Sequence, residues 1–195
     1  MRTTEWKGYG WVNENHLRNY LYLTGDVDED SAIPVIEWIT FHNAIDSKYS
    51  QLYLFVDSGG GDSTTGFSIC NFIRSSSIPI HTIGTGIVGS AALLIFMSGF
   101  HRTLLRSTSV LSHQFSWAIE GKYHDLTADH TELQNVQTRM LEAYKTATGL
   151  PATTISKQLL PAGNRWLTAD QALSYGLCDV VVDKIDMSVL SFDPK

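Results

Sequence analysis

Strand-like and helix-like patterns alternate along most of this chain, and this alternation constrains the fold more than any other feature. Short apolar runs typical of buried strands occur at Tyr20–Thr24, Leu52–Val56, Pro79–Ile83, Arg102–Leu105, Val110–His113 and Cys178–Val182. Helical patterns occur at Ser31–Ile45, Thr64–Ile73, Ser90–Met97 and Asp129–Thr148, with a short last helix opened by Thr168. Because strands that alternate with helices form parallel sheets covered by helices, the sequence predicts an α/β fold.

Composition narrows the class of protein. The chain has 195 residues, of which 43% are hydrophobic and 17% charged, which suits one globular domain and excludes collagen-like, coiled-coil and disordered chains. The net charge of −6 and the lack of a basic stripe argue against nucleic-acid binding. Cys70 and Cys178 are too few for a disulfide framework and have no metal-ligand spacing, so we expect buried thiols, a reducing compartment and no metal site.

No segment of the sequence has the character of a membrane span or a secretory signal. The longest apolar run, Ala91–Met97, is far shorter than the ~20 residues that cross a bilayer. The segment from Met1 to Asn15 is polar with scattered aromatic residues and lacks an apolar stretch. We therefore expect no membrane partner and a cytosol-like compartment.

The first junction that could carry chemistry is Ser58–Gly61, a serine and three glycines after the second strand. In open α/β folds, ligands bind where strands end and helices begin. Consecutive glycines let the backbone approach a ligand and direct N–H groups at negative charge. A flexible turn is the alternative interpretation. A phosphate loop is excluded, because the lysine and the spacing of that motif are missing and Asp62 would repel phosphate.

The second junction places Ser90 between a glycine turn and an apolar helix, in Gly86–Ala92. A serine at this position is often only a helix cap. Alternatively it is a nucleophile, with the next backbone N–H and the helix dipole facing a developing oxyanion. The junction differs from the Gly-x-Ser-x-Gly elbow of α/β hydrolases, because Val88 and Ala92 occupy the glycine positions.

The third junction ends the strand Val110–His113. A single histidine at a strand end is often structural. A serine and a histidine on neighbouring strand ends have a further interpretation, because an imidazole within ~3 Å of a serine hydroxyl activates it as a nucleophile. Ser90 and His113 are therefore candidates for such a pair.

These motifs, taken together with a fourth, resemble the Clp protease proteolytic subunit family, ClpP. The matching segments are Ser58–Gly61, Gly86–Ala92, Ser112–Gln114 and Asn164–Asp179, which have the order and intervals of that family from about Tyr20 to Val182. The last segment is the most specific of the four. The resemblance therefore covers most of the chain.

The resemblance implies a fold and an assembly. The family fold is crotonase-like, with repeated ββα units and a protruding handle helix. It implies a single peptidase domain over 1–195, with a head formed by 1–120 and 150–184, a handle helix at about 125–148 and a loose tail at 185–195. Heptameric rings would stack into a tetradecamer that degrades unfolded chains or short peptides delivered by an AAA+ unfoldase, without a cofactor. The compartment would be the cytoplasm, the plastid stroma or the cytoplasm of a phage-infected host.

The resemblance also implies roles for single residues. Ser90 would be the nucleophile and His113 the general base, and the backbone N–H groups of Gly61 and Ala91 would form the oxyanion hole. A pocket for the hydrophobic loop of the unfoldase would include Tyr53 and Phe55, whose alternative is ordinary core packing.

The sequence departs from the family at two places beside the catalytic residues. Asn164 stands where the family usually has the third catalytic residue, an aspartate, and Ala162-Gly163 replace an acidic–arginine pair that ties rings together. An asparagine orients the catalytic imidazole in Cys-His-Asn enzymes, so we expect a slow but working peptidase.

Two alternatives remain. A catalytically impaired ring subunit could assemble with an active ClpP in mixed rings and regulate it. Another crotonase-type chemistry, acting on acyl-CoA thioesters, would need a glutamate paired with the oxyanion loops, and the sequence shows none.

Overall fold

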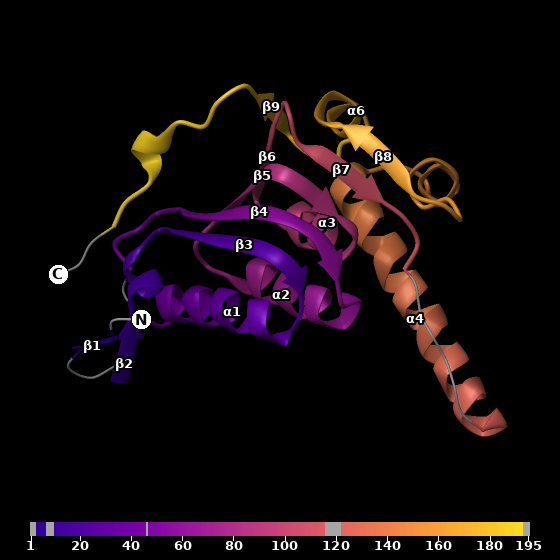
Figure 1. The fold of residues 1–195 in the computed structure, drawn as a ribbon, viewed down its shortest axis with the longest axis horizontal. Helices are drawn as coiled ribbons and strands as arrows, with labels where there is room; N and C mark the ends of the chain where they lie inside the picture. The colour runs from indigo at the N-terminus through magenta and orange to yellow at the C-terminus, as the bar shows by residue number, and fades with distance from the viewer. Residues whose placement is uncertain (1–2, 7–9, 46, 116–121, 193–195) are drawn as a thin grey trace.

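The structure is a computed structural model and describes residues 3–6, 10–45, 47–115 and 122–192 (Figure 1). Its strands are β1 (Thr3–Trp6), β2 (Gly10–Asn13), β3 (Tyr20–Val27), β4 (Leu52–Gly61), β5 (Ile80–Gly89), β6 (His101–Leu105), β7 (Ser109–Ser112), β8 (Arg165–Thr168) and β9 (Val180–Val182). Its α-helices are α1 (Glu29–Ala44), α2 (Ser63–Ser75), α3 (Ser90–Met97), α4 (Tyr123–Thr148), α5 (Ala152–Thr154) and α6 (Ala169–Ser174). Shorter turns are η1 (Glu14–Leu17), η2 (Ile155–Leu159, a π-helical turn) and η3 (Met187–Val189).

The main sheet has seven strands, and its principal path runs β3-β4-β5-β6-β9 with every pair parallel. The long strand β5 pairs with two strands along the same edge. Its residues His81–Gly84 pair with β6, and Ile87–Gly89 near its C-terminal end pair in parallel with β7. β8 then pairs with β7 in antiparallel orientation. The α/β fold expected from the alternation of patterns is thus confirmed, with β8 as an antiparallel addition at one edge.

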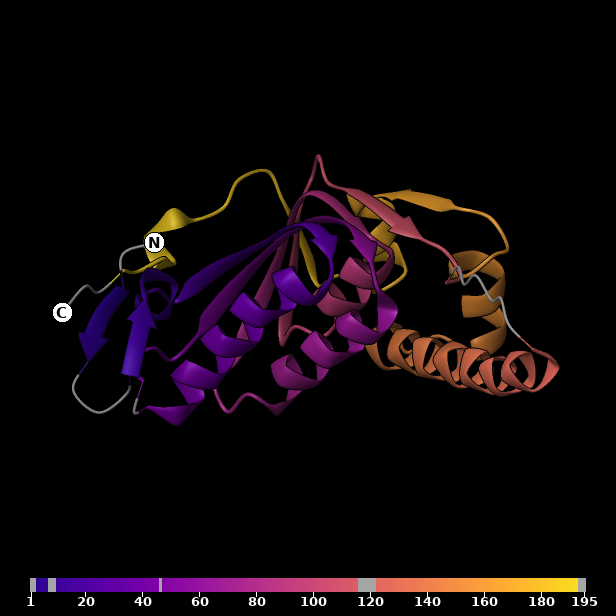
Figure 2. The same cartoon turned by 60° about the horizontal axis from the view of Figure 1, so that its bottom comes forward.

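Helices α1 and α2 cover one face of the sheet, as the two views in Figures 1 and 2 show. α1 begins two residues before the predicted start, because Asp28 and not Ser31 is its N-cap. The Ser31 N–H donates to Asp28 Oδ1 over 2.8 Å, and the Asp28 N–H donates to Ser31 Oγ over 2.9 Å, which completes a capping box. The serine predicted as the cap is therefore its reciprocal partner.

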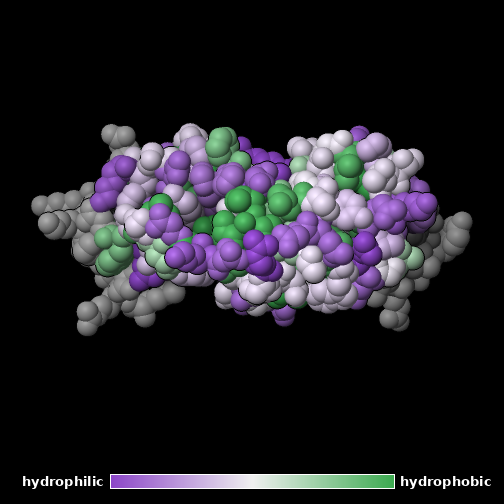
Figure 3. Space-filling model, turned by 90° about the horizontal axis from the view of Figure 1, so that it is seen from above, coloured by the Kyte–Doolittle hydropathy of each residue, from purple (hydrophilic) through white to green (hydrophobic). Residues whose placement is uncertain are grey.

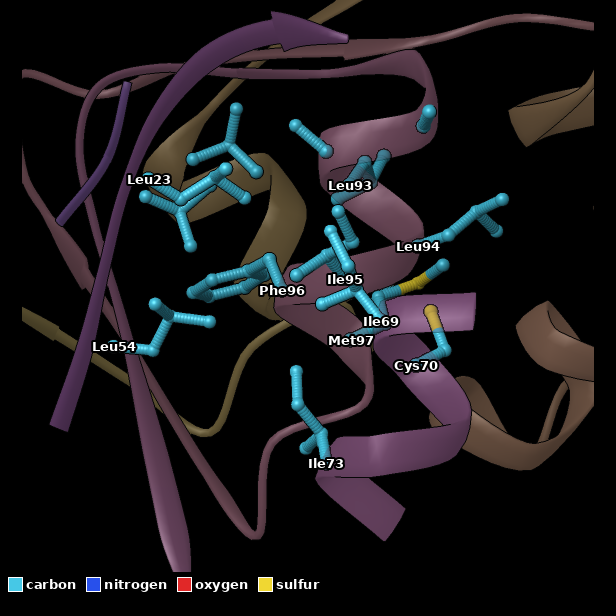
Figure 4. Close-up of a cluster of buried hydrophobic side chains, with 14 of the residues drawn as sticks. Leu23, Leu54, Ile69, Cys70, Ile73, Leu93, Leu94, Ile95, Phe96 and Met97 are labelled. Atoms are coloured by element: carbon cyan, nitrogen blue, oxygen red, sulfur yellow. The ribbon is translucent and has the colours of Figure 1, made fainter. Parts of the chain in front are cut away.

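The core is built around α3, whose residues Ala91–Met97 are all buried. Figure 4 shows the side chains of this helix between the sheet and α2, with Phe96 directed toward Leu54 and Met97 near Cys70. A helix that is apolar on all sides must be enclosed, and the sheet, α2 and α4 enclose it. Truncating a fully buried side chain such as Phe96 to alanine would cost about 3–5 kcal/mol of stability.

Helix α4 extends away from the sheet and protrudes from the rest of the molecule (Figures 1 and 2). It begins at Tyr123, six residues before the predicted start at Asp129. Its buried residues Val136, Met140, Ala143 and Tyr144 follow helical spacing and lie in its C-terminal half. These residues anchor the C-terminal half of the helix to the head. In the part of the chain that the structure describes, no helix is both long and apolar enough to cross a membrane.

The segment expected to be a loose tail, 185–195, follows β9 and lies partly outside the described residues. Its described part, up to residue 192, runs along the sheet and returns to the start of β3. The Asn19 side chain donates to the Val189 carbonyl over 2.9 Å and accepts from the Ser191 N–H over 2.7 Å. Asn19 itself is buried, and a β-bridge joins Arg18 to Phe192. Asn19 and the neighbouring Arg18 thus connect the end of the described segment to the start of β3.

Candidate active site

The glycine segment predicted as a loop is the last part of strand β4. Gly60 and Gly61 have φ angles of +108° and +153°, which favour glycine. A β-carbon on Gly60 would lie 2.5 Å from Ser90 Cβ and 2.8 Å from the Gly89 carbonyl oxygen. The absence of a side chain therefore lets this strand end contact the turn that carries Ser90.

Ser90 lies at the turn from β5 into α3 with a φ of +51°, and no other described residue except glycine has a positive φ. The N-cap of α3 is Gly89, and no side chain caps this helix. The interpretation of Ser90 as a helix cap is therefore wrong. A strained left-handed serine at the positive end of a buried helix is the arrangement that exposes a nucleophilic hydroxyl.

Two side chains fix the bent end of β5 that leads to Ser90. Asp57 Oδ1 accepts the backbone N–H of Ile87 over 2.8 Å. The Thr108 hydroxyl, which is buried, lies 3.0 Å from the Gly84 carbonyl oxygen and 2.6 Å from that of Thr85. These contacts hold the turn in one conformation, as a positioned nucleophile requires.

A cavity of about 290 Å³ lies beside Ser90. It collects residues from β4, α2, α3, α4 and the segment after β7; its lining residues are Gly59, Gly61, Asp62, Ser63, Ser90, Ala91, Leu94, His113, Phe115 and Met140. Four of the predicted site residues, Ser90, His113, Gly61 and Ala91, therefore share one cavity. A serine hydroxyl, an imidazole and backbone N–H groups around one space have the composition needed for acyl transfer.

No hydrogen bond joins the Ser90 hydroxyl to the His113 ring within the described residues. Catalytic hydrogen bonds are often long or poorly aligned until substrate is bound. Ser90 and His113 therefore line the same cavity, without the hydrogen bond through which the hydroxyl proton would pass to the imidazole.

The register of β7 and β8 determines where Asn164 lies. The two strands are antiparallel, and the last aligned pair is Ser112 with Arg165. His113 directly follows this pair on one chain segment and Asn164 directly precedes it on the other, so both residues adjoin the end of the ladder. Asn164 is exposed and does not line the cavity, and in the described structure it forms no hydrogen bond with His113.

Sequence reasoning missed several residues of the cavity wall. Leu94, Phe115 and Met140 provide its apolar side, and Asp62 and Ser63 provide polar groups at the start of α2. Met140 could have been found from the apolar stripe of the long helix. Phe115 could have been found from the period-two alternation that His113 starts, since both side chains point to the same face of an extended segment.

Asp62 introduces a negative charge beside the predicted oxyanion hole. Its Oδ1 accepts the Thr65 N–H over 2.6 Å and caps α2. Among the described residues, no lysine or arginine forms an ion pair with this carboxylate. Within the described ranges, this charge at the cavity wall therefore has no lysine or arginine partner.

The two cysteines do not contribute a nucleophile. Both are free and buried. Burial raises the pKa of Cys178 to about 11 and also raises the pKa of Cys70. Because the thiolate is the reactive form, these thiols are inert at neutral pH.

Tyr53 and Phe55 lie on the other half of β4, about 26 Å and about 20 Å along the strand from Gly61. Together with Ile83 they form a small hydrophobic cluster that packs against Tyr20, Ile185 and Leu190. Figure 3 looks onto the molecule from above and shows a hydrophobic patch surrounded by hydrophilic residues. Tyr53 and Phe55 are themselves buried, whereas Tyr22, whose ring stacks on Phe55 at 4.9 Å, is 52% exposed.

Known proteins resemble this chain in sequence and in fold. A family model described as Clp protease matches residues 9–185. The "ATP-dependent Clp protease proteolytic subunit 2" of Treponema pallidum is 29% identical over 168 residues, which cover 84% of this chain and 82% of the relative. The proteolytic subunit of Pleurastrum terricola is 22% identical, with 88% of each chain covered.

Among solved structures, an asparagine-to-aspartate mutant of ClpP1 from Listeria monocytogenes superposes with a TM-score of 0.75 at 21% identity. The superposition covers 85% of this chain and 92% of that one, and it supports the fold expected from the resemblance. The family model covers far more than half of the residues, and its span includes the cavity with Ser90 and His113. The chain belongs to the Clp protease family.

Proposed function

We propose that this protein is the proteolytic subunit of an ATP-dependent Clp protease, a serine endopeptidase that cleaves unfolded proteins or short peptides. The observation that carries this proposal is the cavity shared by Ser90, His113 and the backbone of Gly61 and Ala91. Membership of the Clp protease family and the names of the relatives support the same function.

The proposed mechanism is acyl transfer through Ser90. Its Oγ attacks the peptide carbonyl carbon while His113 accepts the hydroxyl proton. The negative oxygen of the tetrahedral intermediate accepts hydrogen bonds from the N–H groups of Gly61 and Ala91. The C–N bond then breaks, His113 returns the proton to the leaving amine, and water hydrolyses the acyl-enzyme by the same steps.

Asn164 takes the place of the acid that usually orients the histidine. An amide oxygen that accepts the second N–H of the imidazole would hold the ring but would not stabilise its positive form as a carboxylate does. Replacing the aspartate of a serine-protease triad by asparagine costs roughly 10⁴ in rate, about 5 kcal/mol of barrier. We therefore expect weakened activity.

The cavity favours an apolar side chain of the substrate. Ala91, Leu94, Phe115 and Met140 form its apolar wall. Asp62 makes the polar side negative, which disfavours acidic substrate residues.

The assembly would be the stacked rings of the family, with the protruding helix α4 as the contact between rings and an AAA+ unfoldase at the outer face. We place the docking of the unfoldase at the tyrosine- and phenylalanine-rich face of β3 and β4, around Tyr53 and Phe55. In the described structure Ile185 and Leu190 pack on these two residues, so the exposed member of the face is Tyr22.

Hydrolysis of a short fluorogenic peptide with an apolar cleavage-site residue tests the function. The wild type and Ser90→Ala would be assayed after separation by size, so that the ring assembly of each is known. We expect turnover by the wild-type assembly and none by Ser90→Ala. Equal turnover by both proteins would overturn the proposal.

A second candidate is supported by the surroundings of Asn164, which is exposed and without a hydrogen bond to His113 in the described structure. In this case the chain would be a catalytically impaired ring subunit that joins an active ClpP. Mixing the two proteins would then give hybrid rings with altered turnover, whereas the first candidate predicts turnover by this chain in rings of its own.

A further inference from the structure

The segment that carries His113 is fastened on the side opposite the cavity. Residues 112–115 alternate in their contacts: His113 and Phe115 line the cavity, whereas Ser112 and Gln114 bond to backbone away from it. This is the alternation of an extended chain, in which successive side chains point to opposite sides. Fixing Ser112 and Gln114 therefore fixes the direction in which His113 points.

The first fastening is a buried chain of hydrogen bonds. The Ser112 hydroxyl donates to the Leu159 carbonyl oxygen over 2.5 Å and lies 2.7 Å from the Tyr144 hydroxyl. Because serine has one proton, and it goes to Leu159, the Tyr144 hydroxyl is the donor to Ser112. Both side chains are almost fully buried, and burial raises the pKa of Tyr144, so its hydroxyl keeps its proton.

The second fastening uses the next carbonyl along the chain. The Gln114 amide donates to the Leu160 carbonyl oxygen over 2.9 Å. Successive carbonyls at the end of the π-helical turn η2 thus accept from the residues on either side of His113. Asn164 lies four residues after the second of these carbonyls.

Helix α4 takes part in both sides of this arrangement. Met140 lines the cavity, and Tyr144, one helical turn later on the same face, supports Ser112. Helix α4 therefore forms part of the cavity wall through Met140. Through Tyr144 it also supports the segment that carries His113.

We infer that Ser112 and Gln114 are positioning residues for His113, with Tyr144 as the support of Ser112 from α4. This inference rests on the proposed function, because it explains what orients the side chain of the general base, His113. The anchors act only through His113 and touch neither substrate nor the reacting atoms.

Kinetics of an assembled protein test the inference with Ser112→Ala, Ser112→Thr and Gln114→Met. Thr82→Val is the matched control, since the buried Thr82 hydroxyl also donates to a backbone carbonyl, that of Phe96, over 2.7 Å. We expect Ser112→Ala to lower kcat for a short peptide about tenfold or more with KM within about twofold, because a misplaced catalytic group loses rate and not binding. Ser112→Thr, which retains the hydroxyl, should keep most of kcat.

A readout independent of activity separates this inference from the proposed function. Hydrogen–deuterium exchange should become faster in residues 112–115 in Ser112→Ala and in Gln114→Met, and should stay unchanged there in Thr82→Val. Gln114 is exposed, so its variant tests the anchors even if Ser112→Ala fails to fold. If the wild type hydrolyses no peptide but exchange behaves as stated, the function fails and the anchoring stands. Unchanged exchange at 112–115, or an equal loss of kcat in Ser112→Ala and Thr82→Val, would overturn the inference.

Discussion

Gly60 lies so close to Ser90 that a β-carbon on the glycine would come within 2.5 Å of Ser90 Cβ. Real β-carbons do not approach one another this closely, and the obstacle is bonded directly to the backbone. The positive φ of Gly60 adds strain for any other residue. The end of β4 and the turn that carries Ser90 therefore fit together only while residue 60 is glycine.

Gly60→Ala should therefore displace Ser90 relative to Gly61 and His113. We expect peptide hydrolysis to fall about 100-fold, since a displacement of about 1 Å has this effect on positioned catalytic groups. The melting temperature should also fall. In Gly59→Ala, where the β-carbon meets nothing within 4 Å, the melting temperature should stay near that of the wild type. Wild-type turnover by Gly60→Ala would contradict the proposed geometry.

Asn164→Asp should raise kcat about tenfold or more, because a carboxylate opposite His113 stabilises the imidazolium that forms during attack. The same charge favours the protonated ring, so the acidic limb of the kcat/KM profile should move to higher pH. The profile is measured on size-separated assemblies of both proteins. An unchanged kcat with an unmoved acidic limb would mean that residue 164 does not approach His113.

Asp62→Asn should change the preference for substrate charge without changing the fold. Asparagine caps helices as well as aspartate does, so α2 should keep its start. Removing the negative charge should raise kcat/KM for a peptide with glutamate at the cleavage site, relative to one with glutamine, by about fivefold. The two matched peptides are compared with wild type and variant. Equal ratios in both proteins would place Asp62 outside the substrate pocket.

His42 gives the stability of the protein a dependence on pH. Burial lowers the pKa of His42 to about 4, against the opposing effect of its hydrogen bond with the Arg18 carbonyl. Between pH 6.5 and 4 the unfolded chain therefore binds a proton that the folded chain does not, and stability falls as the pH falls through this range. The expected loss is about 1–2 kcal/mol between pH 6.5 and 5.

Chemical denaturation at a series of pH values measures this loss. In His42→Gln the slope of unfolding free energy against pH should be smaller, whereas His130→Gln, on an exposed part of α4, should retain the slope of the wild type. An unaltered slope in His42→Gln would show that another group causes the dependence.

The parallel core of the fold could be predicted because its strands are continuous apolar runs and its helices have clear boundaries. α3 was predicted with its observed bounds, Ser90–Met97, since a glycine precedes it and polar residues follow. The ends of β4 and β5 were predicted as loops, because glycine is rare in strands. At five of these glycines neighbouring backbone and side chains leave no room for a β-carbon, which the sequence alone does not show; they are Gly60, Gly61, Gly84, Gly86 and Gly89.

The parts of the fold and of the site that could not be predicted depend on contacts between residues far apart in the sequence. Strand β8 has only four residues and one buried side chain, so its pattern is too short to detect, yet its ladder with β7 ends at the residues next to Asn164 and His113. The segment after β9 contacts Asn19, which is 170 residues or more away in the sequence. The cavity brings together Ser90, His113, Gly61 and Ala91 as the resemblance implied, and their catalytic roles stay predictions.

Labelling by a fluorophosphonate probe tests the central claim most directly, because this reagent phosphonylates a serine only where an imidazole and an oxyanion hole activate it. The assembled wild type, Ser90→Ala and His113→Ala would be treated with the probe and examined by mass spectrometry of their peptides. The account predicts one adduct, on Ser90 of the wild type, with none in Ser90→Ala and a strongly reduced yield in His113→Ala. An assembled wild type that takes up no probe, or an adduct that persists in full when His113 is removed, would contradict it.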